Sequence, residues 1–367
     1  MRWQPAGCGD VRARPVDRLL WPVIGSVLIG ARALSAAPEL SVDPLDRPAM
    51  HVAHPERAAL IAITTAGRQL VAVGENGIVA IGGVDGASWD QVLTPVSVTL
   101  TAVAFATDRI GWAVGHSGVI LVTRDAGQSW QRQLDGRQIL ALLTAGEASA
   151  PVDAKQAAGR AAFLAQMLQD GPDKPLLNLH ATDAMHVIVC GAYGLLLVTA
   201  DGGEHWSPRF ESTSDDSGKH LYAVVATATD YVFGGEGGSL YHSASMTDAL
   251  RAVPSPYSGS YFGLVSASPD SIVAYGLRGH AVVTHDGGWH WSNAAIAASG
   301  SINAGRRLKD GRIVLGTQAG ELWVSSDSGS SYHRAAISSP QPISDLVETP
   351  QGLVIVGPRG VAHVALP

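Results

Sequence analysis

Short apolar runs, separated by turns of Gly, Asp and Ser, set the pattern of this chain. Four such runs follow one another in one stretch: Leu100–Phe105, Ile110–Gly115, Val119–Thr123 and Trp130–Leu134. Runs of this length, rich in β-branched residues and bounded by turn residues, are typical of β-strands. The stretch therefore predicts one four-stranded β-sheet.

The same unit recurs along the chain, and a glycine between its second and third runs marks each copy. Successive marker glycines lie 40 to 44 residues apart, except for a step of 76 residues from Gly118 to Gly194 that contains an insertion, residues 135–175. Repeats of this length predict an all-β fold, a seven-bladed β-propeller of four-stranded blades. The seven markers are Gly77, Gly118, Gly194, Gly238, Gly279, Gly320 and Gly360.

Four copies end in the same turn, Thr/Ser-x-Asp-x-Gly-x-x-Trp/Tyr. An Asp carboxylate can accept hydrogen bonds from the backbone of its own turn, and Gly supplies a positive φ. The aromatic ring then fills space between neighbouring sheets. These residue types predict a turn that stabilises the packing of neighbouring sheets and has no catalytic role. Its members are Asp125, Gly127 and Trp130; Asp201, Gly203 and Trp206; Asp286, Gly288 and Trp291; and Asp327, Gly329 and Tyr332.

This turn resembles the Asp box, also called the bacterial-neuraminidase repeat. The longer pattern of Gly111–Trp130, GWAVGHSGVILVTRDAGQSW, is similar to the photosystem II stability/assembly factor family. That resemblance implies a non-catalytic seven-bladed propeller that binds a protein client, in photosynthetic members a photosystem II reaction-centre precursor. It also implies an arginine cluster for client binding, which the sequence does not place. The insertion departs from the photosynthetic pattern and favours a non-photosynthetic bacterial member.

Enzymes built on related repeats need residues that this chain does not offer. Sialidases clamp a carboxylate with three arginines, the first in an Arg-Ile-Pro motif, and no such motif occurs here. Other glycosidases need two carboxylates about 5–10 Å apart, whereas the recognisable acids belong to outer turns. His205 and His290 lack metal-ligand spacing. The sequence predicts no enzyme activity, cofactor or metal.

Two alternatives to the scaffold remain open. One is a glycoside hydrolase or carbohydrate-binding (sialidase-like) propeller, which would need inward-facing carboxylates or an arginine cluster at the mouth of the central channel. The other is a purely structural module.

The insertion contains a helical pattern. Asp153 is a candidate cap for a helix over Ala154–Leu168, which Gly171-Pro172 would end. Its apolar positions predict one buried face with a period of 3.6 residues, which either packs on the propeller rim or docks a partner. That face comprises Ala157, Ala161, Leu164 and Leu168, with Phe163 and Met167 beside it. The candidate docking residues are Phe163, Leu164, Met167 and Leu168.

The amino-terminal residues have the pattern of a secretory signal peptide. The uncharged run Leu19–Ala31 follows three arginines, and small residues come after it. Cleavage is expected near Ser35-Ala36, which predicts a periplasmic or secreted protein that does not span the membrane after signal removal. The expected segments are 1–36 (signal peptide), 37–57 (lead-in) and 58–367 (propeller).

The seventh unit has three runs and stops before a closing turn. We therefore expect Pro48–Ala53 to supply its outer strand and to close the ring. Cys190 is the single cysteine after signal removal, so it cannot form an intrachain disulfide and is expected in the core.

Composition narrows the choice of partners. The chain has 367 residues, a net charge of −7 and 16% charged residues, which argues against nucleic-acid binding. Together with the resemblance, this predicts a monomer that binds a protein client, a membrane protein or an envelope complex.

Overall fold

The computed structural model describes residues 42–147, 154–209, 218–337 and 340–365. These residues belong to one compact unit. Within it the chain forms seven antiparallel sheets, six with four strands and one with three. Each sheet is built from strands that are consecutive in sequence, so each is one blade.

The strands follow one another blade by blade. Blades 1 and 2 contain β1 (Leu60–Ala66), β2 (Gln69–Gly74), β3 (Val79–Gly83), β4 (Trp89–Val92), β5 (Leu100–Phe105), β6 (Gly111–Gly115), β7 (Ile120–Thr123) and β8 (Gln131–Leu134). Blades 3 and 4 contain β9 (Leu176–Ala181), β10 (Val187–Gly191), β11 (Leu196–Thr199), β12 (Ser207–Pro208), β13 (Leu221–Ala226), β14 (Tyr231–Gly235), β15 (Leu240–Ser243) and β16 (Arg251–Val253). Blades 5 and 6 contain β17 (Tyr261–Ser266), β18 (Ile272–Gly276), β19 (Ala281–Thr284), β20 (Ser292–Asn293), β21 (Ile302–Arg307), β22 (Ile313–Thr317), β23 (Leu322–Ser325) and β24 (His333–Ala335). Blade 7 contains β25 (Asp345–Thr349), β26 (Gly352–Gly357) and β27 (Gly360–Val364).

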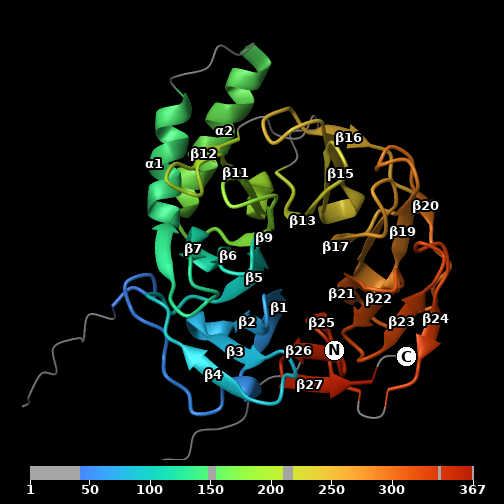
Figure 1. The fold of residues 1–367 in the computed structure, drawn as a ribbon. Coiled ribbons are helices and arrows are strands. Elements are labelled where there is room, and N and C mark those ends of the chain that lie inside the picture. Colours follow the sequence, from blue (N-terminus) through green and yellow to red (C-terminus); the bar gives the residue numbers. More distant parts are fainter. Residues whose placement is uncertain (1–41, 148–153, 210–217, 338–339, 366–367) are drawn as a thin grey trace, which may run out of the picture. The chain divides into compact units, whose positions relative to one another are not determined.

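The first strands of successive blades contact one another in the order β1, β5, β9, β13, β17, β21 and β25, and β25 contacts β1. The sheets of this unit therefore surround a central axis (Figure 1). The repeat spacing predicted this arrangement, and the seven-bladed β-propeller is confirmed.

The antiparallel order gives the unit two faces. The links between the second and third strands of each blade lie on one side, which we call the link face. The turns between the first and second strands lie on the other side with the Asp-box turns, and we call this the box face. In blade 2 a backbone bond joins the two kinds of turn, because the Ala126 N–H donates to the Arg109 carbonyl oxygen at 2.9 Å.

Apolar side chains fill the space between neighbouring sheets. Trp112 is fully buried in a cluster formed by blades 2 and 3, and its indole N–H donates to Gln133 Oε1 at 3.0 Å. Burial of such large rings contributes about 25 cal/mol for each Å² of apolar surface. Packing of this kind holds each blade against the next.

Two helices, α1 (Gly136–Glu147) and α2 (Ala154–Asp170), lie between β8 and β9, that is, between blades 2 and 3. The sequence predicted only the second of these helices. Asp135 caps α1, since its Oδ1 accepts the Arg137 backbone N–H at 2.9 Å. Asp153, the expected cap of α2, lies outside the described residues. None of the helices in the described part has the length and apolar character needed to cross a membrane.

The segment expected to close the ring does not form a strand. Among the described residues blade 7 has three strands, and Pro48–Ala53 joins no sheet. This segment lies along β4 of blade 1, where the Gln91 side chain pairs with its backbone. The Val52 N–H donates to Gln91 Oε1 at 2.7 Å, and Gln91 Nε2 donates to the Met50 carbonyl oxygen at 2.8 Å. The prediction that Pro48–Ala53 completes blade 7 is therefore wrong.

Blades 7 and 1 meet directly. On the inside, the Ile63 N–H of blade 1 donates to Asp345 Oδ2 of blade 7 at 3.0 Å, and Arg306 Nη2 of blade 6 also reaches blade 1, donating to the Ile63 carbonyl oxygen at 3.1 Å. On the outside, His363 Nε2 lies 3.1 Å from the Gly86 carbonyl oxygen. Side-chain hydrogen bonds thus join the two blades where the sequence predicted a shared strand.

Candidate functional site

The Asp125 carboxylate stabilises the closing turn of blade 2 by accepting hydrogen bonds from it. Asp125 Oδ1 accepts the Thr123 hydroxyl at 2.8 Å and the Ser129 N–H at 2.9 Å, and Oδ2 accepts the Ser129 hydroxyl at 2.6 Å. Gly127 has a φ of +89°, and its carbonyl oxygen accepts the Trp130 indole N–H at 3.0 Å. Burial raises the pKa of Asp125, but these hydrogen bonds outweigh burial and lower the pKa overall. The carboxylate is engaged within its own turn.

Three other blades repeat this arrangement with a change at one position. Asp201, Asp286 and Asp327 each accept the hydroxyl of the Thr or Ser two residues earlier. Where blade 2 has a serine, His205 Nδ1 lies 2.7 Å from Asp201 Oδ2, and His290 Nδ1 lies 2.6 Å from Asp286 Oδ2. Both histidines therefore take part in the turn. The remaining box residues are Gly203, Gly288 and Gly329, all with positive φ, and the aromatic Trp206, Trp291 and Tyr332.

Acid should loosen these turns. Hydrogen bonds from the backbone and ring of His205 lower the pKa of Asp201 to about 2, from an ordinary value of 3.8. Because the folded-state pKa is the lower one, the turn stabilises the fold above the ordinary value and loses this contribution as pH falls toward 2. Asp201→Asn is therefore expected to flatten the decline of the thermal midpoint between about pH 5 and pH 2, followed by circular dichroism. Equal slopes for variant and wild type would contradict this account.

The buried face of α2 differs from the predicted one. Leu164 and Met167 are 6% and 1% exposed, and both belong to the core shared by blades 2 and 3 and α1. Phe163 packs half-buried against the same core, whereas Leu168 is 54% exposed. The two alanines expected on the apolar face are also exposed. The longer side chains fix the rotation of the helix, so the chain itself covers most of the candidate docking residues and leaves Leu168 accessible.

The central cavity has a volume of about 450 Å³ and is lined by the first strands of all seven blades. Its lining contains one carboxylate, Asp345, and one guanidinium, Arg306, with Arg306 Nη2 3.5 Å from Asp345 Oδ1. Burial raises the pKa of Asp345, and the nearby Arg306 opposes this. Glycoside hydrolysis needs two carboxylates about 5–10 Å apart. The lining residues therefore lack the pair of acids that the hydrolase alternative requires.

Other reactive side chains are also engaged or covered. The described residues hold no group of three or more His, Cys, Asp or Glu that could bind a metal ion. Cys190 is fully buried in β10, and burial raises the pKa of its thiol, so little thiolate forms near neutral pH.

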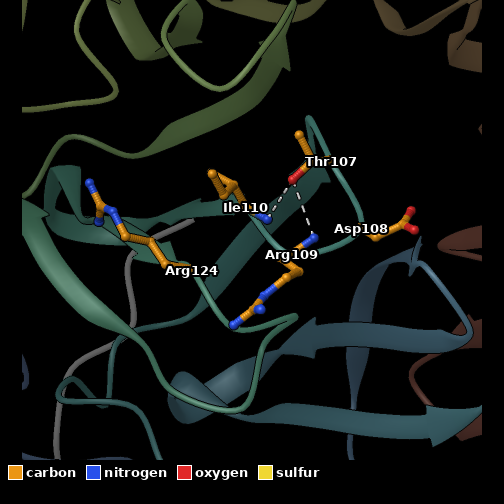
Figure 2. Close-up of a pocket in the computed structure, with 5 residues that line it drawn as sticks. All are labelled: Thr107, Asp108, Arg109, Ile110 and Arg124. Carbon is orange, nitrogen blue, oxygen red and sulfur yellow. Dashed lines mark hydrogen bonds between the residues drawn. The ribbon is translucent and has the colours of Figure 1, made fainter.

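An open depression of about 580 Å³ lies on the box face of blade 2 (Figure 2). The β5–β6 turn, Thr107–Ile110, and Arg124 of the Asp-box turn line it. Thr107 Oγ1 shapes the turn by accepting the backbone N–H groups of Arg109 at 3.3 Å and of Ile110 at 2.9 Å. Figure 2 shows Arg109 and Arg124 on opposite sides of Ile110, with the Asp108 carboxylate directed away from both.

These arginines are exposed, and no described residue forms an ion pair with them. Among the described residues, the side chains of Arg68, Arg109 and Arg124 form no hydrogen bond or ion pair. Arg68 lies in the β1–β2 turn, where a Cβ on Gly67 would come within 3.2 Å of Asp108 Cβ, so the turns of blades 1 and 2 adjoin. We call Arg68, Arg109 and Arg124 the arginine patch. Guanidinium groups bind carboxylates and phosphates in a bidentate manner, so the patch suits an anionic group.

The sequence did not single out any member of the arginine patch. Arg124 stands between the Thr and the Asp of its box, where other boxes have Ala200, His285 and Ser326. Comparing this variable position across the repeats would have found it. Arg109 gives no such signal, because only the fold places the β5–β6 turn beside the box turn.

Two curated relatives match this chain in sequence. A protein of Synechococcus sp. (strain CC9902), described as photosystem II assembly lipoprotein Ycf48, is 25% identical over 163 residues, covering 42% of this chain and 46% of its own length. A chloroplast protein of Oryza sativa subsp. japonica, described as photosystem II stability/assembly factor HCF136, is 26% identical over 245 residues, covering 64% of this chain and 43% of its own length. The chain thus spans less than half the length of these relatives.

A solved structure described as YCF48 bound to D1 peptide superimposes with a TM-score of 0.58 at 17% identity, covering 85% of this chain and 94% of that chain. At this identity the likeness shows the fold alone. The sequence model of the family described as photosynthesis system II assembly factor YCF48 matches residues 165–360, more than half of the chain. This chain therefore belongs to the YCF48 family of photosystem II assembly factors.

Proposed function

We propose that this protein is a non-catalytic scaffold that binds a protein client through the box face. One curated relative is described as an assembly lipoprotein and the other as a stability/assembly factor, and a solved structure is described as YCF48 bound to D1 peptide. The observation that carries the proposal is the arginine patch, three exposed guanidinium groups without partners among the described residues, in a chain of net charge −7.

The chemistry of the patch defines the client segment. Each guanidinium offers a planar set of donors that pairs with a carboxylate, and three of them on adjoining turns match an acidic stretch of polypeptide. Such a segment reaches the box face without entering the channel. The client is a membrane protein or an envelope complex, and the scaffold acts as a monomer.

The absence of catalysis is part of the proposal. The lining of the central cavity offers a single carboxylate, already paired with Arg306, and the box aspartates are held within their own turns. These placements support a role in binding and give no support to a hydrolase.

We also propose export of the chain, with residues 1–36 as the signal peptide, 37–57 as the lead-in and 58–367 as the propeller. The basic and apolar pattern of the first residues supports this, and one curated relative is described as a lipoprotein. Amino-terminal sequencing of the protein from the envelope fraction tests it. A mature chain beginning near Ser35-Ala36 is expected, and an intact first residue would contradict the proposal.

Salt tests the proposed mode of binding. The immobilised chain is expected to capture a membrane protein from detergent-solubilised membranes of the cell that produces it. Raising sodium chloride from about 0.05 to 0.5 M should release this client, because salt screens exposed charge pairs. Capture of the same proteins in equal amounts at both salt concentrations would contradict binding through the arginine patch.

A further inference from the structure

The mouth of the central channel on the link face is built by a repeated irregularity. In six blades the first strand pairs with the second through a β-bulge at its second residue, which leaves that residue out of the ladder. Bulges re-aim side chains and are frequent beside functional sites. All six bulged residues line the central cavity: Ile61, Thr101, Leu177, Tyr222, Phe262 and Asn303.

The mouth has two chemically different halves. Leu177, Tyr222 and Phe262, from blades 3 to 5, form an apolar and aromatic wall, and the rings of Tyr222 and Phe262 meet edge to face with centroids 5.7 Å apart. Asn303 and Ser344, from blades 6 and 7, form a polar wall on the other side. None of these residues is charged.

A tyrosine from a second strand adds a hydroxyl to the polar side. Tyr275 of β18 lines the cavity although only 5% of the residue is exposed. Gly263 and Gly305 of the two adjoining first strands make room for it, because a Cβ at either position would overlap the Tyr275 ring or hydroxyl. Glycine inside a strand weakens it and often marks a close approach of this kind. The channel is therefore shaped to admit this side chain.

Several polar atoms at this mouth are available to a ligand. Among the described residues, the hydroxyls of Tyr222, Tyr275 and Ser344 form no hydrogen bond. Asn303 donates through Nδ2 to the Ile343 carbonyl oxygen at 3.3 Å, which leaves its Oδ1 available. These atoms supply both donors and acceptors without any net charge.

We propose that the channel mouth on the link face binds a neutral saccharide. The aromatic wall can cover the apolar C–H face of a sugar ring, while the opposite wall offers hydroxyl and amide groups to the sugar hydroxyls. The cavity of about 450 Å³ falls in the range of small-molecule sites, roughly 300–1,000 Å³. No covalent step follows, because the lining has a single carboxylate.

An extended peptide fits this mouth less well. A peptide that adds to a sheet needs a regular strand edge with unbroken backbone donors and acceptors. The bulges interrupt the first strands at the level of the mouth in six blades. The two charged residues of the cavity lining, Asp345 and Arg306, pair with each other at 3.5 Å, which likewise argues against an anionic or cationic ligand.

The saccharide site goes beyond the proposed client binding and lies on the other face of the unit. A row of rings leads to it from the rim: Tyr193 lies 5.0 Å from His220, and His220 lies 5.9 Å from Tyr222, between ring centroids. Tyr193 holds a φ of +57°, which is rare for a bulky residue. The row extends the aromatic wall outward and can follow a chain of several sugar residues.

Titration with tetra-N-acetylchitotetraose and maltotetraose, two neutral oligosaccharides, tests the proposal by NMR and calorimetry on the wild-type chain. At least one is expected to bind with a Kd of about 1 mM or tighter. The Tyr222→Ala/Phe262→Ala variant should weaken binding about tenfold or more. Asn303→Ala, which keeps the rings, should also weaken it. Trp289→Ala removes an exposed aromatic residue outside the cavity lining and should leave affinity unchanged.

Three results would overturn the saccharide site: no binding of either oligosaccharide at about 10 mM, equal affinity in the wild type and the Tyr222→Ala/Phe262→Ala variant, or binding of a proline-rich decapeptide at this mouth in place of both oligosaccharides. Salt-sensitive capture of the protein client is measured in parallel on the same variants. Because that capture depends on the box face, its loss or retention separates a failure of the saccharide site from a failure of the proposed function.

Discussion

Gly329→Ala is expected to lower the free energy of unfolding by about 2–4 kcal/mol. Gly329 closes the Asp box of blade 6 with a φ of +92°, where an L side chain is strained. A Cβ at this position would also overlap Cγ2 of Val273, which is fully buried in blade 5. Both costs fall on the turn that fastens one blade to the next. Urea unfolding followed by tryptophan fluorescence measures the change.

The neighbouring residue, Ser328, provides a matched control, because its replacement should change the free energy of unfolding in the opposite direction. Ser328 has a φ of +57° and is exposed, and the equivalent residues of two other boxes are Gly202 and Gly287. Ser328→Gly should therefore raise the free energy of unfolding by about 0.5–1 kcal/mol. If both variants changed stability in the same direction, the account of the box as a turn that needs left-handed backbone would be wrong.

The Arg109→Ala/Arg124→Ala variant is expected to bind the protein client roughly tenfold to a hundredfold more weakly. A hydrogen bond to a charged group contributes about 1.5–3 kcal/mol. These two guanidinium groups have no partner among the described residues, so the client's hydrogen bonds to them replace no bond within the chain. Stability should change by less than about 0.5 kcal/mol, because both side chains are exposed. Calorimetry with the captured client measures the affinity.

The repeat itself supplies the control for this variant. Ser326 occupies in blade 6 the box position that Arg124 occupies in blade 2, and it is also exposed. Ser326→Ala should leave client affinity unchanged. Equal weakening by both substitutions would show that the variable box position matters for every blade and not for the arginine patch alone.

The sequence was sufficient for the architecture because the repeat carries it. Each copy brings the same β-branched runs and the same link glycine, so the number of blades follows from the spacing of residues such as Gly279 and Gly320. The Asp-box turn is equally local, since Asp125 and its hydrogen-bond partners lie within a few residues of one another. Local interactions of this kind are visible in a single sequence.

The errors arose where the structure depends on contacts between distant segments. The lead-in lies along β4 because Gln91 pairs with its backbone, and no sequence pattern marks a glutamine for that role. The rotation of α2 depends on what Leu164 and Met167 meet in blades 2 and 3 and α1. The alanines of α2 misled the periodicity, because an alanine is compatible with either side of a helix.

The candidate sites were hidden for the same reason. The arginine patch exists because three turns share the box face, and the channel mouth exists because bulges turn one residue of the first strand inward in six blades. Neither feature corresponds to a recognisable sequence motif. Both lie at positions where the blades differ, which the conserved pattern of the repeat does not describe.

The central claim is that the client contacts the box face of blade 2. Site-specific photocrosslinking tests it most directly, with benzoyl-phenylalanine placed at position 128, an exposed residue of the blade 2 box turn that leaves the three arginines intact, or at the equivalent position 330 of blade 6. Each sample is exposed to solubilised membranes, and the account predicts a crosslink to an acidic segment of one membrane protein from position 128 and none from position 330. Equal crosslinking from both positions, or crosslinking from position 330 alone, would contradict it.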